Sequence, residues 1–512
     1  MSEELAQPQI THDYDPRSTE EQVTIYNWVE YGEGNLVIRA RAGAGKTTTL
    51  VEIAKLLPAD ASTTFLAFNV HIKDELKTKL PKNVFCYTTH GLGYSAIKRK
   101  YKDAEVDNFK ADKVIGKQAK KWNLDGIDNK LDYMTNMKKL VSLIRLSLTH
   151  DKKYVPDICE RHDIKFDGED INRAFQVLEE MYNDKKTIDY VDMVYMPCVD
   201  PKIWLFPQDY VLVDEAQDLS RAQHELIKKC VKKNKAGQFI GRMIYVGDDM
   251  QAIYGFAGAD SYSFNSLTKI PNTIVLPLTT SFRCAKNVIL EANKLVADIK
   301  ALPDAPDGIV RKGSVLMEVK DGDFVLSRKT FPLVKLFFEL LVEDRKAYIK
   351  GSDIGASLIE FTENHNTPSQ LDASLTNKLA EYRENLRAHG VLNYQEDTRY
   401  VALNDKVKIL RFLMGMVDNV AALKQRINYI FKETSNEGIV LSTVHKAKGL
   451  EADKVFIIMP KDLPLRTGIP QQYVQELNLK YIAITRAKYE LVFDEDWTVD
   501  DGTFEEFTLD HE

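Results

Sequence analysis

The sequence predicts an α/β protein built on two parallel β-sheets. Short apolar segments typical of buried strands recur along the 512 residues and alternate with longer helical stretches, which is the arrangement that parallel sheets require. Because these segments fall into two sets, we expect two sheet domains. The segments lie at 64–68, 210–213, 242–246, 273–276, 323–326, 438–442, 454–458 and 490–493.

An apolar run typical of a strand leads into a glycine-rich segment near the N-terminus. Residues 40–47 read Ala-Arg-Ala-Gly-Ala-Gly-Lys-Thr. Glycine is needed at Gly43 and Gly45 because a side chain there would keep backbone N–H groups from closing around a phosphate. Lys46 would neutralise the β- and γ-phosphates, and the Thr47 hydroxyl would bind Mg²⁺. This segment predicts a site for a nucleoside triphosphate, and we expect contacts from Ala42, Gly43, Ala44, Gly45, Lys46, Thr47 and Thr48.

Two adjacent carboxylates follow the predicted strand at 210–213. Asp214 stands at the end of the strand, where it would help to hold Mg²⁺. Glu215 would point elsewhere and could take a proton from the attacking water. A phosphate-binding loop requires a partner strand that carries acid, so the pair predicts hydrolysis of the bound triphosphate with Lys46 and Glu215 as catalytic residues.

The composition is that of a globular protein with two to four domains. Hydrophobic residues make up 44% of the chain and charged residues 28%, and no segment resembles a membrane span. The polar N-terminus is typical of neither a secretory signal nor a transit peptide. The five cysteines form no Cys-x-x-Cys pair, which favours reduced thiols. We therefore expect a cytoplasmic location, or another intracellular compartment, and no membrane partner.

The net charge of −7 is unevenly distributed. The segment 494–512 carries nine acidic residues and neither Lys nor Arg, so the first 493 residues carry a net charge of +2. A near-neutral body can hold a basic groove, and the acidic balance therefore does not exclude a nucleic-acid partner. The segment is typical of a solvated chain end, although Trp497, Phe504 and Phe507 leave open a peptide that docks on a protein partner.

Two long helical stretches interrupt the pattern of strands. The first surrounds its apolar positions with lysines, which is compatible with a basic face and equally with a solvated helix surface. The second carries apolar residues at helical spacing. We therefore predict a sheet domain at 1–94 and 187–284 with a helical insertion at 95–186, a second sheet domain at 285–351 and 434–493 with a smaller helical insertion at 352–433, and an acidic tail at 494–512.

Four further segments complete an ordered set of motifs. They read YVGDDMQAIYGF at 245–256, LTTSFR at 278–283, STVHKAKGLE at 442–451 and YIAITRAK at 481–488. Together with the glycine-rich loop and the acidic strand end, this order resembles the motif set of the UvrD/Rep-type (superfamily 1A) DNA helicases. Within this family, the residues at 66–69, 444–448 and 478–481 are most similar to those of the F-box DNA helicase branch, although no F-box segment is evident in the sequence. The resemblance implies two RecA-like P-loop NTPase domains, each with a mainly helical insertion.

The resemblance also implies how ATP would be bound and split. Gln22 matches a glutamine that reads adenine, Phe282 an aromatic residue that stacks on the base, and Glu451 a carboxylate that binds the ribose. The remaining matches would act on the γ-phosphate or on the attacking water. They are Gln251, Arg283 and Arg486, which join Lys46 and Glu215 as catalytic candidates.

A third group of matches implies contacts to single-stranded DNA. Phe68, Tyr254 and Phe256 match aromatic residues that stack on bases, which suits a grip independent of sequence; for Phe68 core packing is the alternative. Phosphate and sugar contacts are expected from Thr89, His90, Thr443 and His445. Ala257 stands where the family usually has an arginine, so the link between nucleotide state and base grip is expected to be looser. Val70-His71 replaces the usual Asn-Lys, which leaves open whether the family's phosphate contact is made at that position.

The motif set implies an ATP-dependent DNA helicase or translocase that moves 3′→5′ on single-stranded DNA and acts at junctions between single and double strands. Two alternatives remain open: a translocase that strips proteins from DNA, and an ATP-gated binding module that recruits a partner through the acidic tail. DNA repair, recombination, replication and defence all use such motors, and the sequence does not choose among them.

Overall fold

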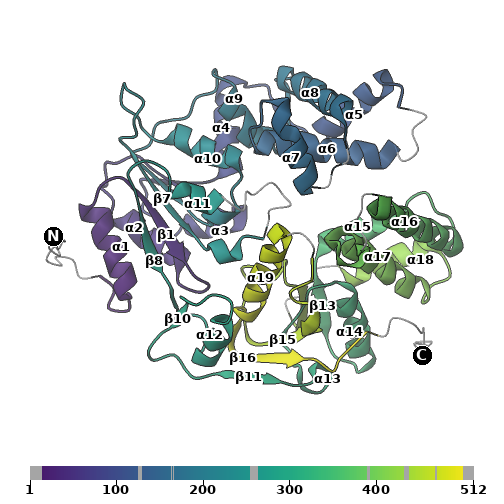
Figure 1. The fold of residues 1–512 in the computed structure, drawn as a ribbon. Coiled ribbons are helices and arrows are strands. Elements are labelled where there is room, and N and C mark those ends of the chain that lie inside the picture. The colour runs from purple at the N-terminus through teal and green to yellow at the C-terminus, as the bar shows by residue number, and fades with distance from the viewer. Residues whose placement is uncertain are drawn as a thin grey trace. The chain divides into compact units, whose positions relative to one another are not determined.

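A computed structural model describes residues 14–124, 130–162, 164, 166–253, 263–388, 393–431, 437–467 and 470–499. The chain divides into two compact units, with the break between Thr279 and Thr280. Each unit holds one six-stranded sheet in which every strand pair is parallel (Figure 1). The predicted fold class is therefore confirmed.

The N-terminal sheet has the strand order β3-β2-β6-β7-β1-β8. Its side chains alternate between two cores, because successive residues of a strand point to opposite faces. Leu36 and Ile38 of β1 pack in one core with helices α1 and α2, and Val37 packs in the other with α4 and α10. The strands are β1 (Asn35–Ala40), β2 (Thr63–Ala67), β3 (Val84–Thr88), β6 (Tyr210–Val213), β7 (Arg242–Gly247) and β8 (Thr273–Leu278).

Helices cover both faces of this sheet, as a parallel sheet requires. The helices are α1 (Glu20–Tyr31), α2 (Lys46–Leu56), α3 (Val70–Leu76), α4 (Thr89–Lys100), α9 (Asp192–Val199), α10 (Arg221–Cys230) and α11 (Ser263–Leu267). Among the described residues, no helix is both long and apolar enough to cross a membrane.

Four helices between α4 and α9 form the insertion of the N-terminal unit and enclose a core of their own (Figure 1). They are α5 (Lys110–Lys121), α6 (Lys130–Leu146), α7 (Val155–His162) and α8 (Gly168–Asn183), and the short parallel strands β4 (Glu105–Val106) and β5 (Thr187–Ile188) pair at their base. Lys113, Lys117 and Lys138 form ion pairs with carboxylates of the same unit. These pairs favour the solvated-surface interpretation of the lysines over a basic face.

A buried ionic cluster fixes this insertion to the sheet domain. Arg145 of α6 donates to Asp189 at 2.8 Å and to Asp192 at 3.0 Å, and Lys110 of α5 donates to Asp192 at 2.7 Å. All four side chains are buried. Since breaking a buried pair leaves an uncompensated charge, the cluster holds α5 and α6 in one position against α9.

The C-terminal sheet has the order β11-β16-β15-β12-β14-β13. Its strands are β11 (Ile309–Lys312), β12 (Phe324–Ser327), β13 (Ala347–Lys350), β14 (Ile439–Thr443), β15 (Ala452–Ile458) and β16 (Ala487–Asp494), with the short pair β9 (Thr280–Ser281) and β10 (Lys300–Ala301) beside them. The helices are α12 (Lys286–Ala292), α13 (Val315–Glu318), α14 (Phe331–Val342), α15 (Ser352–Thr362), α16 (Pro368–Ala388), α17 (Thr398–Met414), α18 (Val420–Ile430) and α19 (Pro470–Ile484). Helices α15 to α18 share one core with the sheet, unlike the insertion of the N-terminal unit.

The described start of the acidic segment belongs to this unit. Asp494 ends β16 and accepts hydrogen bonds from the backbone N–H groups of Val315 and Trp497, at 2.7 and 2.8 Å. The indole of Trp497 donates to Glu339 at 2.9 Å and packs against the core. Trp497 is therefore engaged within the fold, while Phe504 and Phe507 lie outside the described residues.

One buried histidine makes the stability of the N-terminal unit depend on pH. His224 of α10 is 5% exposed and lies 6.1 Å from the Tyr245 ring, and neither ring nitrogen has a hydrogen-bond partner in the described part of the chain. Burial lowers the pKa of His224 to about 3. The unfolded chain therefore binds an extra proton below about pH 6.5, and stability falls as the pH drops through that value.

We expect His224→Leu to remove this sensitivity. Between pH 8 and pH 5 the wild-type protein should lose about 2 kcal/mol more unfolding free energy than the variant, measured by urea denaturation at both pH values. The same substitution at exposed His150 serves as the control and should leave the pH dependence unchanged. An equal loss in wild type and His224→Leu would contradict the assignment.

Candidate functional site

The glycine-rich loop connects the end of β1 to the start of α2. Gly43 and Gly45 have φ values of 72° and 77°, a region that residues with a side chain rarely adopt. Gly45 is the N-cap of α2 and caps the helix with no side-chain hydrogen bond. The first N–H groups of α2 are thus presented at a positive helix end, which is an arrangement that binds phosphate.

Asp214 and Glu215 come from β6 and contact two different residues of the loop. The Thr47 hydroxyl donates to Asp214 Oδ2 at 2.6 Å, and Lys46 Nζ lies 3.1 Å from Glu215 Oε1. Glu215 has a φ of 51°, in the left-handed region that residues with a side chain rarely adopt. The structure therefore brings together the four residues, with Asp214 at Thr47 and Glu215 at Lys46.

The donor set of this site fits Mg²⁺ and a triphosphate. A hydroxyl and a carboxylate 2.6 Å apart offer the hard oxygen ligands that Mg²⁺ prefers. Burial and the neighbouring Glu215 raise the pKa of Asp214 to about 6. Burial and the charge of Glu215 both disfavour the ionised form of Asp214, and a nearby cation stabilises that form. Lys46 is one such cation, and a bound Mg²⁺ would be another.

The end of β7 adds a second polar group beside the loop. Gln251, which is 4% exposed, donates to Asp248 Oδ2 at 2.7 Å. Arg41 donates to Asp248 at 3.2 Å and to Asp249 at 2.7 Å. The sequence analysis did not single out Arg41, because this position of the loop has no fixed chemical role. In the structure its two hydrogen bonds connect the loop to the residues that follow β7.

Gln22 lies at the first turn of α1, close to α2. Its Oε1 accepts from the Thr19 backbone N–H at 3.0 Å, and its Nε2 donates to Thr49 Oγ1 at 3.0 Å. The amide thus completes a capping box and contacts the helix that follows the loop. Recognition of adenine by Gln22 remains a prediction, and it would require exchange of at least one of these partners.

The remaining nucleotide candidates lie in the C-terminal unit and are close together there. They include Phe282 and Arg283, which the predicted bounds of 187–284 assigned to the first sheet domain, because the break between the units falls before Thr280. Arg283 Nε donates to Glu451 at 2.5 Å, and Lys488 lies 3.2 Å from the same carboxylate. Arg486 is 1% exposed and donates to the Leu450 and Ile482 carbonyls at 3.0 Å. Phe282, beside Arg283, is 42% exposed.

The guanidinium of Arg486 is buried, and its hydrogen-bond acceptors carry no charge. Its hydrogen bonds within the described residues go to uncharged acceptors, namely the two carbonyls and the Thr485 hydroxyl. Burial, together with the positive charge of Arg283, lowers the pKa of Arg486 to about 9. A buried guanidinium without an anion is a strong binding group for phosphate.

Several DNA candidates line one cavity of about 260 Å³ in the N-terminal unit, which we call the stacking cavity. Phe68 is 41% exposed, so core packing does not account for its side chain. The His90 ring stacks on that of Tyr190 with centroids 3.8 Å apart, and burial lowers the pKa of His90 to about 4. The lining consists of Leu66, Ala67, Phe68, Thr89, His90, Tyr190, Val213, Asp214, Asp218, Leu219 and Gln223.

Tyr190 was missed by the sequence analysis. It follows the two-residue strand β5, belongs to none of the ordered motifs and is 57% exposed. The only signal in the sequence is an aromatic residue at the return from the helical insertion to the sheet domain, which is weak by itself.

The other DNA candidates that the structure describes do not line the stacking cavity. Thr443 ends β14 in the C-terminal unit, and His445 follows it half-buried, where burial and then the charge of Arg328 lower its pKa to about 3. Tyr254 and Phe256, like Ala257, lie outside the described residues.

A phosphate-binding loop, a paired acidic strand end and two parallel sheets define a P-loop nucleoside triphosphatase. Family models agree and are more specific: the UvrD/REP helicase N-terminal domain matches residues 20–271, and the UvrD-like helicase C-terminal domain matches residues 361–494. The chain belongs to the UvrD/Rep-type helicase family.

Curated relatives agree with this assignment. F-box DNA helicase protein 1 of Schizosaccharomyces pombe is 24% identical over 90% of this chain and 55% of its own length. F-box DNA helicase 1 of Gallus gallus is 27% identical over 95% of this chain and 49% of its own length. A probable DNA helicase II homolog of Mycoplasma pneumoniae is 23% identical over 90% of this chain and 82% of its own length. The chain thus spans about half the length of the two F-box relatives.

Proposed function

We propose that this protein is an ATP-dependent DNA helicase or translocase that moves 3′→5′ along single-stranded DNA and unwinds duplexes at single-strand to double-strand junctions. One observation carries the proposal. The stacking cavity is lined both by Asp214, which contacts the phosphate-binding loop, and by the exposed aromatic residues Phe68 and Tyr190. A shift of the β6 end on hydrolysis would therefore reach the surface that grips bases.

The hydrolytic step uses the contacts around the loop. Thr47 and Asp214 would hold Mg²⁺, which would supply charge neutralisation at the phosphates. Lys46 exchanges Glu215 for the β- and γ-phosphates, and this exchange frees the Glu215 carboxylate to accept a proton from the attacking water. Gln251 orients that water, while Arg283 and Arg486 neutralise the charge that develops on transfer.

Membership of the family supports the proposed direction and substrate. The F-box and Rep relatives are DNA helicases by name, and 3′→5′ movement is the polarity of the UvrD/Rep-type motif set. The same motif set supports ATP as the nucleotide and an intracellular compartment that contains DNA. Among the alternatives, a translocase that displaces proteins uses the same residues. Recruitment through the acidic tail has less support, since Trp497 packs within the fold.

Strand-displacement assays on duplexes with a 3′ or a 5′ single-stranded tail test the proposal. We expect DNA-dependent ATP hydrolysis and displacement only with the 3′ tail. Displacement that requires a 5′ tail would overturn the polarity. Removal of streptavidin from biotinylated single strands, without duplex displacement, would favour the protein-stripping alternative.

We expect Tyr190→Ala to weaken binding of single-stranded DNA by about 1–3 kcal/mol, the range for loss of one base–aromatic stack. Tyr190→Phe should retain most of the affinity because it keeps the ring. Fluorescence anisotropy with an oligothymidylate at two salt concentrations measures both, and binding should weaken with salt in every variant. Tyr31→Ala, at an exposed position of α1, is the matched control; equal affinities for Tyr190→Ala and this control would rule out stacking on Tyr190.

A further inference from the structure

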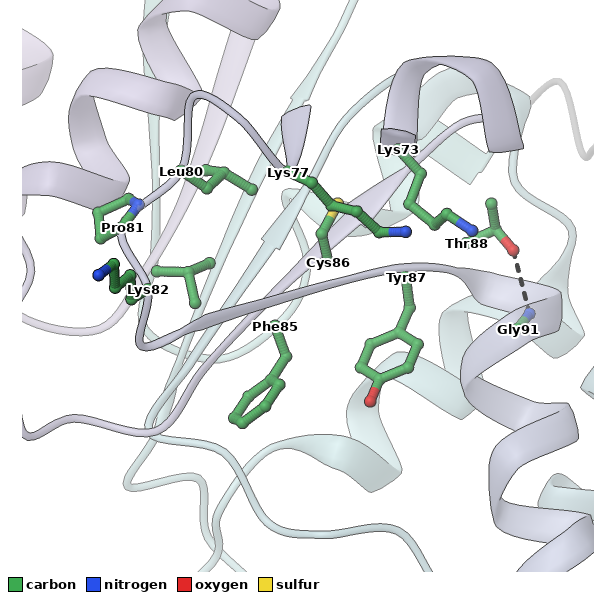
Figure 2. A pocket seen from close by; sticks show the side chains of 11 residues that line it. Lys73, Lys77, Leu80, Pro81, Lys82, Phe85, Cys86, Tyr87, Thr88 and Gly91 are labelled. Atoms are coloured by element: carbon green, nitrogen blue, oxygen red, sulfur yellow. Dashed lines mark hydrogen bonds between the residues drawn. The ribbon is translucent and has the colours of Figure 1, made fainter. Parts of the chain in front are cut away.

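A second cavity lies at the open edge of the N-terminal sheet and is both basic and aromatic. It has a volume of about 440 Å³ and is lined by Lys73, Lys77, Lys82, Phe85 and Tyr87, among others. Figure 2 shows Lys73 and Lys77 on one side of β3 and the rings of Phe85 and Tyr87 on the other. We call this cavity the β3-edge pocket.

The aromatic residues of the pocket are unusual for an edge strand. Phe85 is 59% exposed, and β3 has a neighbour on one side only, β2. An exposed ring beside the open backbone groups of an edge strand offers a surface on which another chain or a base can associate. Core packing therefore does not account for the Phe85 side chain, which is free to contact a ligand.

The lysines of the pocket leave positive charge available. Asp74 lies 2.8 Å from Lys77 and 3.5 Å from Lys73, and all three side chains are partly or largely exposed. Lys82 has no ion-pair partner among the described residues. Exposed ion pairs contribute little free energy, so a polyanion can compete with Asp74 for the two lysines.

The β3-edge pocket adjoins the stacking cavity along the chain. Thr88 and Gly91 line the pocket, whereas Thr89 and His90 line the stacking cavity. The stacking cavity also takes residues from the ends of β2 and β6, the next two strands of the sheet after β3. A strand that crosses the sheet ends from β6 to β2 and then to β3 therefore reaches the open edge next.

We propose that the β3-edge pocket binds the continuation of the single-stranded DNA that occupies the stacking cavity. Lys73, Lys77 and Lys82 contact its phosphates, and Phe85 and Tyr87 stack on its bases. The proposal rests on the proposed function, because it takes the same strand as its ligand. An acidic peptide that adds to the β3 edge is the other chemistry that fits lysines and an open strand; the continuity with the stacking cavity favours DNA.

The first test compares short and long oligothymidylates, of about 6 and about 16 nucleotides, near the limits of a single binding site. The double variant Lys82→Glu/Phe85→Ala should bind the short oligonucleotide like the wild type. For the long one it should lose about tenfold in affinity. Lys79→Glu is the matched control, because Lys79 is exposed, pairs with Glu75 at 2.5 Å and does not line the pocket.

The second test uses the wild-type protein and an uncharged probe. Cys86 is half-buried and lines the pocket, whereas half-buried Cys198 does not. Burial raises the pKa of Cys86 to about 11, so alkylation with iodoacetamide is slow. It is followed over hours at about pH 8, where the lysines keep their charge, and quantified by mass spectrometry. The long oligonucleotide should slow the alkylation of Cys86 and leave that of Cys198 unchanged, and the short one should protect neither.

The outcomes separate this proposal from the function on which it rests. Equal affinities of wild type and double variant for the long oligonucleotide, with unprotected Cys86 and intact DNA-stimulated ATP hydrolysis, would overturn the pocket and leave the helicase standing. Absence of any DNA stimulation in the wild type would overturn both. Protection of Cys86 by a poly-glutamate peptide but not by DNA would assign the pocket to an acidic protein partner instead.

Discussion

Replacement of Glu215 by glutamine, or of Lys46 by alanine, is expected to reduce DNA-stimulated ATP hydrolysis by at least about a hundredfold. Glutamine keeps the shape of Glu215 but cannot accept the proton of the attacking water. Alanine removes the charge that Lys46 would bring to the phosphates. The two residues form an ion pair of 3.1 Å, yet the variants should differ in how they bind ATP.

The difference arises because Glu215 and the phosphates compete for one ammonium group. Glu215→Gln removes the competitor, so ATP should bind at least as tightly as in the wild type. Lys46→Ala should bind ATP more weakly. Steady-state hydrolysis and binding of a fluorescent ATP analogue measure the two effects, with exposed Lys55→Ala and Glu225→Gln as matched controls. Turnover within threefold of wild type in either variant would contradict the assignment.

Replacement of Arg283 or Arg486 by alanine is expected to abolish most hydrolysis while DNA affinity changes little. Both arginines belong to the C-terminal unit, whereas the phosphate-binding loop belongs to the N-terminal unit. Cations that neutralise charge on a transferring phosphoryl group commonly contribute 10³–10⁵ in rate, so a loss of at least about a hundredfold is expected for each. Normal hydrolysis by either variant would require a different contact from the C-terminal unit.

Because Arg486 is buried, a second variant is needed to separate a loss of catalysis from a loss of folding. Alanine leaves a cavity where the guanidinium lay, 1% exposed, so a loss of activity could reflect a loss of folding. Arg486→Lys keeps the charge and most of the volume but lacks the planar fork. It should retain the thermal stability better than alanine and still hydrolyse ATP poorly. Arg387→Ala, on the exposed surface of α16, is the control, and anisotropy with a single-stranded oligonucleotide reports DNA affinity.

The central strands of both sheets and the edge strand β8 could be predicted from the sequence, whereas the other three edge strands of the two sheets could not. The eight predicted segments coincide with β2, β6, β7, β8, β12, β14, β15 and β16 within a few residues. The strands β3, β11 and β13 were missed, and all three lie at sheet edges. An edge strand is partly solvated and carries polar or exposed residues, as in the Ile-Val-Arg-Lys of β11, so the apolar run that marks a buried strand is absent.

The loop and its acidic partners were predictable because their chemistry fixes both residue type and spacing. Tyr190 was not, because its role depends on the stack with His90, which is distant in the sequence. The lysines of the first insertion were ambiguous for a similar reason, since their pairing with carboxylates is a property of the folded chain. The capping role of Gln22 could have been predicted from the Thr-x-x-Gln spacing at Thr19.

The ionic cluster at the base of the first insertion has a mechanical consequence. Asp189, held by Arg145, immediately precedes Tyr190, the ring that stacks on His90. Removal of one partner of a buried charge pair typically costs about 3–5 kcal/mol. A displacement of α5 and α6 relative to the sheet domain would therefore reach the residue next to the Tyr190 ring, because the buried cluster joins the two.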